Sequence, residues 1–235
     1  IKIFVGTRET SGYFGALKEG FRNLGYYCKF YDFYSHHFSY GLDDNNESKL
    51  IKTFVSFIDK IEKNKLKGIV NFLAIIFTYI LAFIVFIICC IKFNIFIFYS
   101  NSGFWRLKPW DYYIFKLLRK KIIFVSLGTD IRPPYLNGKF IYNKRYSLNS
   151  IYKETQKILK KINRMESVAD YIISYPAHSQ LLNKKFINGL IIGNPAEINL
   201  LNEKELNEEE KINNNILKPI RILHAPSHPE TKGTY

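Results

Sequence analysis

The chain has few cysteines, and their spacing defines neither a disulfide framework nor a metal site. Cys28, Cys89 and Cys90 are the three cysteines in 235 residues, and the last two lie in an apolar run where cysteine behaves as a small hydrophobic residue. Proline and glycine occur at ordinary levels, which excludes a low-complexity chain. We therefore expect a globular protein from a reducing, cytoplasmic compartment, with no metal and no cofactor.

Acidic residues are also scarce relative to basic ones. There are 34 lysines and arginines against 20 aspartates and glutamates, which gives a formal net charge of +14. The lysines are scattered, and no zinc-finger or RNA-stacking signature accompanies them, so we do not expect nucleic acid as a partner. The positive charge is typical of a solvated surface or of a surface that faces anionic lipid or anionic sugar carriers.

Short apolar runs alternate with segments of helical spacing along most of the chain. The alternation predicts an α/β fold in which a Rossmann-like, doubly wound parallel sheet has helices on both faces. The predicted strands are 1–6, 26–33, 94–99, 121–126, 170–175 and 190–192, and the predicted helices are 13–24, 47–65, 110–119, 149–168 and 177–183.

The domain organisation follows from where this alternation stops. Residues 1–195 are predicted to form the first domain, and the polar, acidic stretch 196–218 is typical of a linker. Residues 219–235 contain an apolar run followed by a loop, which indicates the first strand and loop of a second domain. Since the chain also begins at Ile1, we expect it to be a fragment of a two-domain protein.

The segment 69–91 lacks any charged residue, proline or glycine over 23 residues. As a helix it is about 34 Å long, enough to cross the hydrocarbon core of a membrane, which is about 30 Å thick. A single crossing here conflicts with one sheet built from residues on both sides of the segment. We expect a helix that attaches the protein to the membrane without crossing it, with a protein-covered helix and a true span as the alternatives.

Two loops that follow predicted strands carry the candidate site residues. Open α/β sheets bind ligands at the carboxyl ends of their strands. The first loop, 6–15, contains Arg8, Glu9 and Gly12 and offers backbone N–H groups at a helix start, although it lacks the G-x-G-x-x-G pattern. The loop 128–134 contains Asp130 and Arg132, which either bind a ligand or pair with each other. His178, after Pro176, is either a helix cap or a cleft residue.

Four segments together resemble a known family. They are the glycine-containing first loop, 127–132 (Leu-Gly-Thr-Asp-Ile-Arg), 170–176 (Asp-Tyr-Ile-Ile-Ser-Tyr-Pro) and 225–234, which includes Lys232-Gly233. In this order they are similar to bacterial retaining glycosyltransferases of the GT-B fold, the family-four-like group that builds surface polysaccharides. Where that family often has a histidine before Gly-x-Asp, this chain has Ser126 and Leu127.

The resemblance implies a function and a role for each candidate residue. It implies transfer of a sugar from a nucleotide-sugar donor to a cell-surface polysaccharide or a lipid-linked glycan, at the cytoplasmic face of the cell membrane. Asp130 is then the catalytic residue, Arg8, Glu9, Gly12 and Arg132 bind the acceptor, and Ser227, His228 and Lys232 bind the donor phosphates. A GT-B sugar-nucleotide epimerase and a non-catalytic, membrane-anchoring half of a two-subunit transferase are the alternatives.

Overall fold

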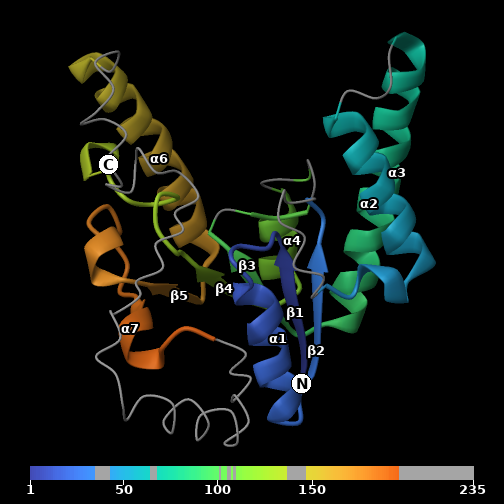
Figure 1. The fold of residues 1–235 in the computed structure, drawn as a ribbon, viewed down its shortest axis with the longest axis horizontal. Helices are drawn as coiled ribbons and strands as arrows, with labels where there is room; N and C mark the ends of the chain where they lie inside the picture. Colours follow the sequence, from blue (N-terminus) through green and yellow to red (C-terminus); the bar gives the residue numbers. More distant parts are fainter. Residues whose placement is uncertain are drawn as a thin grey trace, which may run out of the picture.

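A six-stranded, all-parallel sheet forms the centre of the computed structural model, which describes residues 1–34, 43–63, 68–100, 102–104, 107, 110–136 and 147–195. The strand order is β2-β1-β3-β4-β5-β6 (Figure 1). The strands are β1 (Lys2–Thr7), β2 (Tyr27–Asp32), β3 (Ile95–Tyr99), β4 (Lys121–Val125), β5 (Tyr171–Ser174) and β6 (Ile187–Asn188). The predicted doubly wound α/β fold is confirmed.

Helices connect the strands. The α-helices are α1 (Tyr13–Asn23), α2 (Lys49–Glu62), α3 (Gly68–Lys92), α4 (Trp110–Leu117), α6 (Leu148–Val168) and α7 (Gly189–Ile192). Among the residues that the structure describes, three short 3₁₀ helices cover Asn45–Glu47, Pro134–Leu136 and Pro176–His178. Figure 1 shows α6 on the left and the α2–α3 pair on the right, toward opposite ends of the row of strands.

The strands form where apolar side chains run without interruption, because a parallel sheet is covered on both faces. In β1, five consecutive residues from Ile3 to Thr7 are buried. The order of the strands changes direction between β1 and β3, since β2 lies on one side of β1 and all later strands lie on the other. Such a reversal is where ligands bind in open α/β sheets.

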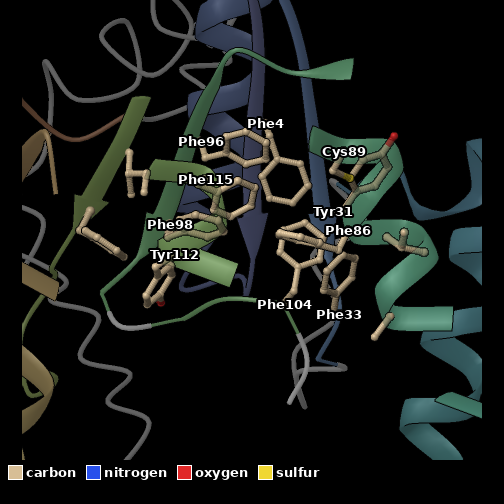
Figure 2. Close-up of a cluster of buried hydrophobic side chains, with 14 of the residues drawn as sticks. Phe4, Tyr31, Phe33, Phe86, Cys89, Phe96, Phe98, Phe104, Tyr112 and Phe115 are labelled. Carbon is tan, nitrogen blue, oxygen red and sulfur yellow. The ribbon is translucent and has the colours of Figure 1, made fainter. Parts of the chain in front are cut away.

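Two hydrophobic clusters lie on the two faces of the sheet. The smaller one joins α1 to the sheet through Phe14, Val5 and Ile97. The larger one is dominated by aromatic rings, with Phe96 and Phe115 only 4.1 Å apart between ring centroids. Figure 2 shows the rings of this cluster converging from the sheet, α4 and α3.

Helix α3 contributes to this larger cluster with one face only. Its buried residues are Ala74, Thr78, Leu81, Ala82, Val85, Phe86, Cys89 and Cys90. Most of its other apolar side chains remain exposed, such as Phe72 at 61% and Ile80 at 53%. Within the described residues, α3 is the one helix long and apolar enough to cross a membrane, which by itself is weak support for a span.

The register of the sheet restricts what α3 can do. Ile3 of β1 pairs with Ile95 of β3, and Val5 pairs with Ile97, so the strands before and after α3 belong to one sheet. If α3 crossed a membrane once, these hydrogen-bonded strands would lie on opposite sides of it. The sheet is therefore incompatible with a single crossing by α3.

Two of the predicted elements differ in the structure. Residues 190–192 were predicted as a strand, but the strand is Ile187–Asn188 and residues 189–192 form α7, because the Asn188 side chain accepts a hydrogen bond from the backbone N–H of Leu190 and starts a helical turn. The helix predicted at 177–183 is the single 3₁₀ turn Pro176–His178. The predicted linker at 196–218 and the second domain at 219–235 lie outside the described residues.

Candidate functional site

Loops from three strands surround a cleft at the carboxyl edge of the sheet. The cleft has a volume of about 390 Å³. Its walls come from the loop after β1, the loop after β4 and the segment after β5, through Thr10, Ser11, Leu127, Tyr175 and His178. The sequence pattern predicted that polar groups from different loops would lie at this edge. Thr10 and Tyr175, which are 165 positions apart in the chain, line the same cleft.

Glu9 lies inside the protein and not at the surface of this cleft. Its side chain is 4% exposed, and its carboxylate accepts hydrogen bonds from the backbone N–H groups of Thr10 (2.6 Å), Phe14 (3.1 Å) and Gly15 (2.9 Å). A carboxylate at this position accepts hydrogen bonds from N–H groups of the first turn of α1 that have no partner within the helix. Its negative charge is also stabilised by the positive end of the helix dipole. Some of the N–H groups that we expected to bind an anionic ligand therefore donate hydrogen bonds to Glu9 instead.

The other two candidates of the first loop are placed differently. Arg8 is exposed, and its guanidinium lies 5.9 Å from the centre of the Tyr34 ring. Gly12 precedes α1 with φ of 76°, a left-handed conformation that glycine adopts without strain. Gly12 therefore shapes the loop through its backbone, and Arg8 keeps its charge in solvent at the edge of the sheet.

Asp130 is held by the loop in which it lies. One carboxylate oxygen, Oδ1, accepts a hydrogen bond from the backbone N–H of Gly128 at 2.8 Å. The other oxygen, Oδ2, is buried and has no partner among the described residues. A buried carboxylate oxygen without a donor is costly, so this oxygen is a candidate to accept a hydrogen bond from a bound hydroxyl once the loop adjusts.

His178 lies against the same loop from the segment after β5. A Cβ added to Gly128 would be 3.8 Å from Cε1 of His178, so the ring and this backbone are in contact range. Burial lowers the pKa of His178, the charge of Arg132 lowers it further, and the charge of Asp130 opposes both effects. The imidazole is therefore neutral at pH 7, and its buried Nδ1 has no partner among the described residues.

Two further ionisable groups at the carboxyl ends of the strands were not singled out from the sequence. Burial, opposed by a backbone hydrogen bond from Tyr34, raises the pKa of Asp32 at the end of β2 to about 7. Burial and the charge of Asp130 raise the pKa of Tyr99 at the end of β3 to about 12. The available signal was position, because both residues directly end an apolar strand.

The site therefore brings together some predicted residues and separates others. Asp130, Arg132 and His178 are close enough for their charges to affect one another, while Glu9 is buried beneath the first loop. Ser227, His228 and Lys232 lie outside the described residues. In the part of the chain that is described, no three His, Cys, Asp or Glu side chains are grouped so that they could hold a metal ion.

The fold places this chain in the class of Rossmann-like α/β proteins. Comparison of the chain with models of protein families, with curated proteins and with solved structures finds no significant match. The function must therefore be inferred from the geometry of the site.

Proposed function

We propose that this chain is the acceptor-side domain of a glycosyltransferase, which transfers a sugar from a nucleotide-sugar donor to a glycan or a lipid-linked acceptor. The observation that carries the proposal is the arrangement of Asp130 and His178 at the carboxyl edge of a doubly wound sheet. Each has one buried polar atom, Oδ2 and Nδ1 respectively, without a partner among the described residues. Both atoms can accept a hydrogen bond from a hydroxyl group.

The proposed chemistry needs little else from this domain. The acceptor hydroxyl attacks the first carbon of the donor sugar, and the nucleoside diphosphate leaves. A residue that accepts a hydrogen bond from the hydroxyl orients it and favours loss of its proton, and correct placement supplies much of the rate enhancement. Asp130 serves this role in the proposal, and neutral His178 beside it is the second candidate.

The donor phosphates are assigned to the segment 225–234 by its resemblance to the transferase family. Ser227 and His228 would contact the diphosphate, and Lys232 would neutralise its charge. Replacing Lys232 by alanine in the full-length enzyme is expected to raise the activation free energy of transfer by about 1.5–3 kcal/mol, the usual value of a hydrogen bond to a charged group.

Attachment to the cytoplasmic face of the cell membrane through α3 is part of the proposal. One face of α3 is packed against the protein, and the opposite face exposes apolar side chains, including Phe72, Ile80 and Phe83, along its length. An exposed apolar surface of this extent is typical of a membrane or protein contact. A helix lying in the membrane interface would cover it and leave the sheet on one side.

The test is transfer of a labelled sugar by the protein expressed from its complete gene. Asp130→Asn keeps an oxygen for the Gly128 N–H but removes the carboxylate charge, so we expect transfer to fall about 10²-fold or more, the scale of lost acid–base catalysis. The matched control is Asp170→Asn, because Asp170 is also hydrogen-bonded but directly precedes β5, at the opposite edge of the sheet.

The outcomes separate the alternatives. Loss of transfer in Asp130→Asn with an unchanged circular dichroism spectrum, and retention in Asp170→Asn, supports the proposal. Equal rates in wild type and Asp130→Asn would remove Asp130 from the mechanism. A product that is an epimerised sugar nucleotide, with no glycan extended, would instead identify an epimerase.

A further inference from the structure

A second pocket is lined by the loop that carries Asp130. It has a volume of about 510 Å³ and is formed between this loop and α6. Thr129 and Asp130 line it from the loop, and Lys153, Lys157 and Lys161 line it from the helix. The hollow is of the size that holds small molecules in other proteins.

The three lysines form one row along α6. They are spaced four residues apart, so they lie on the same side of the helix and span about 12 Å along its axis at 1.5 Å per residue. Like charges at this spacing repel one another and destabilise a helix. The row therefore favours a negatively charged partner in the pocket.

The side chains that line the pocket supply less negative charge than positive charge. Among the described residues, Lys29, Lys63 and Lys121 each lie within 4.0 Å of a carboxylate oxygen, whereas no such ion pair involves Lys153, Lys157 or Lys161. Glu154 and Asp130 also line the pocket, so three positive and two negative side chains surround it. Glu154 and the three lysines are all exposed, and the Oδ1 atom of Asp130 is hydrogen-bonded to Gly128, so the side chains that line the pocket carry a net charge of +1.

The two sides of the pocket select different chemical groups. Lysine ammonium groups bind phosphate oxygens as point charges, and three of them in a row suit a phosphate or diphosphate. The Thr129 hydroxyl and the Asp130 carboxylate suit the hydroxyl groups of a sugar. A molecule that satisfies both sides carries hydroxyls at one end and phosphate at the other.

We infer that this pocket binds the phosphate group of a phosphorylated sugar acceptor, with the sugar directed to Asp130. This inference rests on the proposed transferase function and gives its acceptor a chemical class. The phosphate comes either from a free sugar phosphate or from the diphosphate that joins a sugar to a lipid. Both sources place the same oxygens against Lys153, Lys157 and Lys161.

The experiment measures binding directly and needs no transfer activity. Inorganic pyrophosphate and a hexose 1-phosphate are titrated into the ¹⁵N-labelled chain, and the amide shifts of Thr129 and Lys157 are followed by NMR. Lys157→Gln removes the central charge of the row and should weaken binding about tenfold, the usual effect of one charged hydrogen bond in a partly exposed site. Lys160→Gln is the matched control, because Lys160 is an exposed lysine of the same helix that does not line the pocket.

A second arm distinguishes the sources of the phosphate. Vesicles that contain a lipid diphosphate are compared with vesicles of the same charge made with phosphatidylglycerol, and protein that sediments with each is measured. Sedimentation that requires the lipid diphosphate and Lys157, but not Lys160, identifies a lipid-linked acceptor. Binding of hexose 1-phosphate in solution without this selectivity identifies a free sugar phosphate.

Two results would overturn the inference. If Lys157→Gln and Lys160→Gln weaken phosphate binding equally, the binding comes from the general positive charge of the surface and not from this pocket. An absence of amide shifts with both probes at millimolar concentration would show that the pocket binds no phosphate. Lys157-dependent binding together with no sugar transfer by the full-length protein would leave this phosphate site standing and refute the transferase.

Discussion

The carboxylate of Glu9 accepts a hydrogen bond from the backbone N–H of Gly15 at 2.9 Å, across the first turn of α1. The same carboxylate also holds the N–H groups of Thr10 and Phe14. The glycine-containing loop after β1 is therefore closed by its own acidic side chain. Its backbone is fixed before any ligand binds, and the cleft is formed by the outer side of the loop, through Thr10 and Ser11.

Replacement of Glu9 by alanine should destabilise the domain. The change leaves buried N–H groups without an acceptor, and each such group costs about 1–3 kcal/mol. The control is Glu19→Ala on α1, since the Glu19 side chain is 42% exposed and its ion pairs with Lys18 and Arg22 are worth about 1 kcal/mol or less. Urea denaturation followed by circular dichroism compares the two, and equal midpoints would contradict the capping role of Glu9.

Phe86 and Phe83 belong to the same helix but to opposite environments. Phe86 is 2% exposed and packs against Phe104 and Phe115 (Figure 2) at centroid distances of 5.3 and 5.0 Å. Phe83, in contrast, is 51% exposed. We expect Phe86→Ala to lower the free energy of unfolding by about 3–5 kcal/mol, because it leaves a cavity in the core.

Phe83→Ala serves as the control, because it removes the same ring from an exposed site. Its effect should stay within about 0.5 kcal/mol, as for most surface substitutions. Denaturation in a mild detergent measures both. Similar losses in the two variants would mean that α3 does not pack on the sheet as the structure has it.

Charges on the outer face of α3 should release the protein from membranes. The double variant Ile80→Glu and Phe83→Glu places two carboxylates on this face, where each wild-type side chain contributes about 1.5–3 kcal/mol if it is fully buried in lipid. Sedimentation with phospholipid vesicles should therefore weaken about 10²-fold. Leu148→Glu with Ile191→Glu is the control, because these residues are 85% and 84% exposed and lie on α6 and α7.

Reporter proteins fused to the two ends of the chain should both report the cytoplasm in cells. The reason is that β1 and β3 pair in one sheet on either side of α3 in the sequence. Unchanged vesicle binding of the α3 double variant would argue that α3 is covered by protein. Reporters on opposite sides of the membrane would contradict attachment without crossing.

Asp32 should make stability depend on pH near neutrality. Its pKa is about 7 in the folded protein and 3.8 as its ordinary value, so the folded state binds the proton more tightly than the unfolded state. Protonated Asp32 therefore contributes to the stability of the fold. This contribution is fully present below about pH 3.8 and is lost as the pH rises through about 7. Asp32→Asn keeps an acceptor for the N–H of Tyr34 and cannot ionise, so the stability of this variant should not fall as the pH rises through 7.

The expected gain of Asp32→Asn at pH 8 is about 1–2 kcal/mol, less than the full linkage value because the side chain is only partly buried. Urea midpoints of wild type and variant at pH 5 and pH 8 measure it, and carbon NMR of the carboxyl group gives the pKa directly. A variant that follows the wild-type pH profile would place the pKa of Asp32 near its ordinary value.

Some features of the site were open to prediction and others were not. The loop 128–134 was identified because it follows a buried strand, and Asp130 of this loop lines the pocket formed with α6. The approach of the His178 ring to the backbone at Gly128 could not be foreseen, because these residues are 50 positions apart and their closeness depends on β4 and β5 being neighbours. Glu9 was predicted to face a ligand, but only the folded loop turns its carboxylate back onto α1.

By itself the sequence determined most of the helices and strands and the parallel sheet, because apolar runs and helical spacing are local patterns set by the periods of strand and helix. It also determined that 69–91 is a helix of unusual hydrophobicity. Only the tertiary structure decided which face of that helix packs, which strands are neighbours and which lysines of α6 line a pocket. These relations depend on contacts between segments that are distant in the sequence, and the periodicity of a single helix or strand carries no information about such contacts.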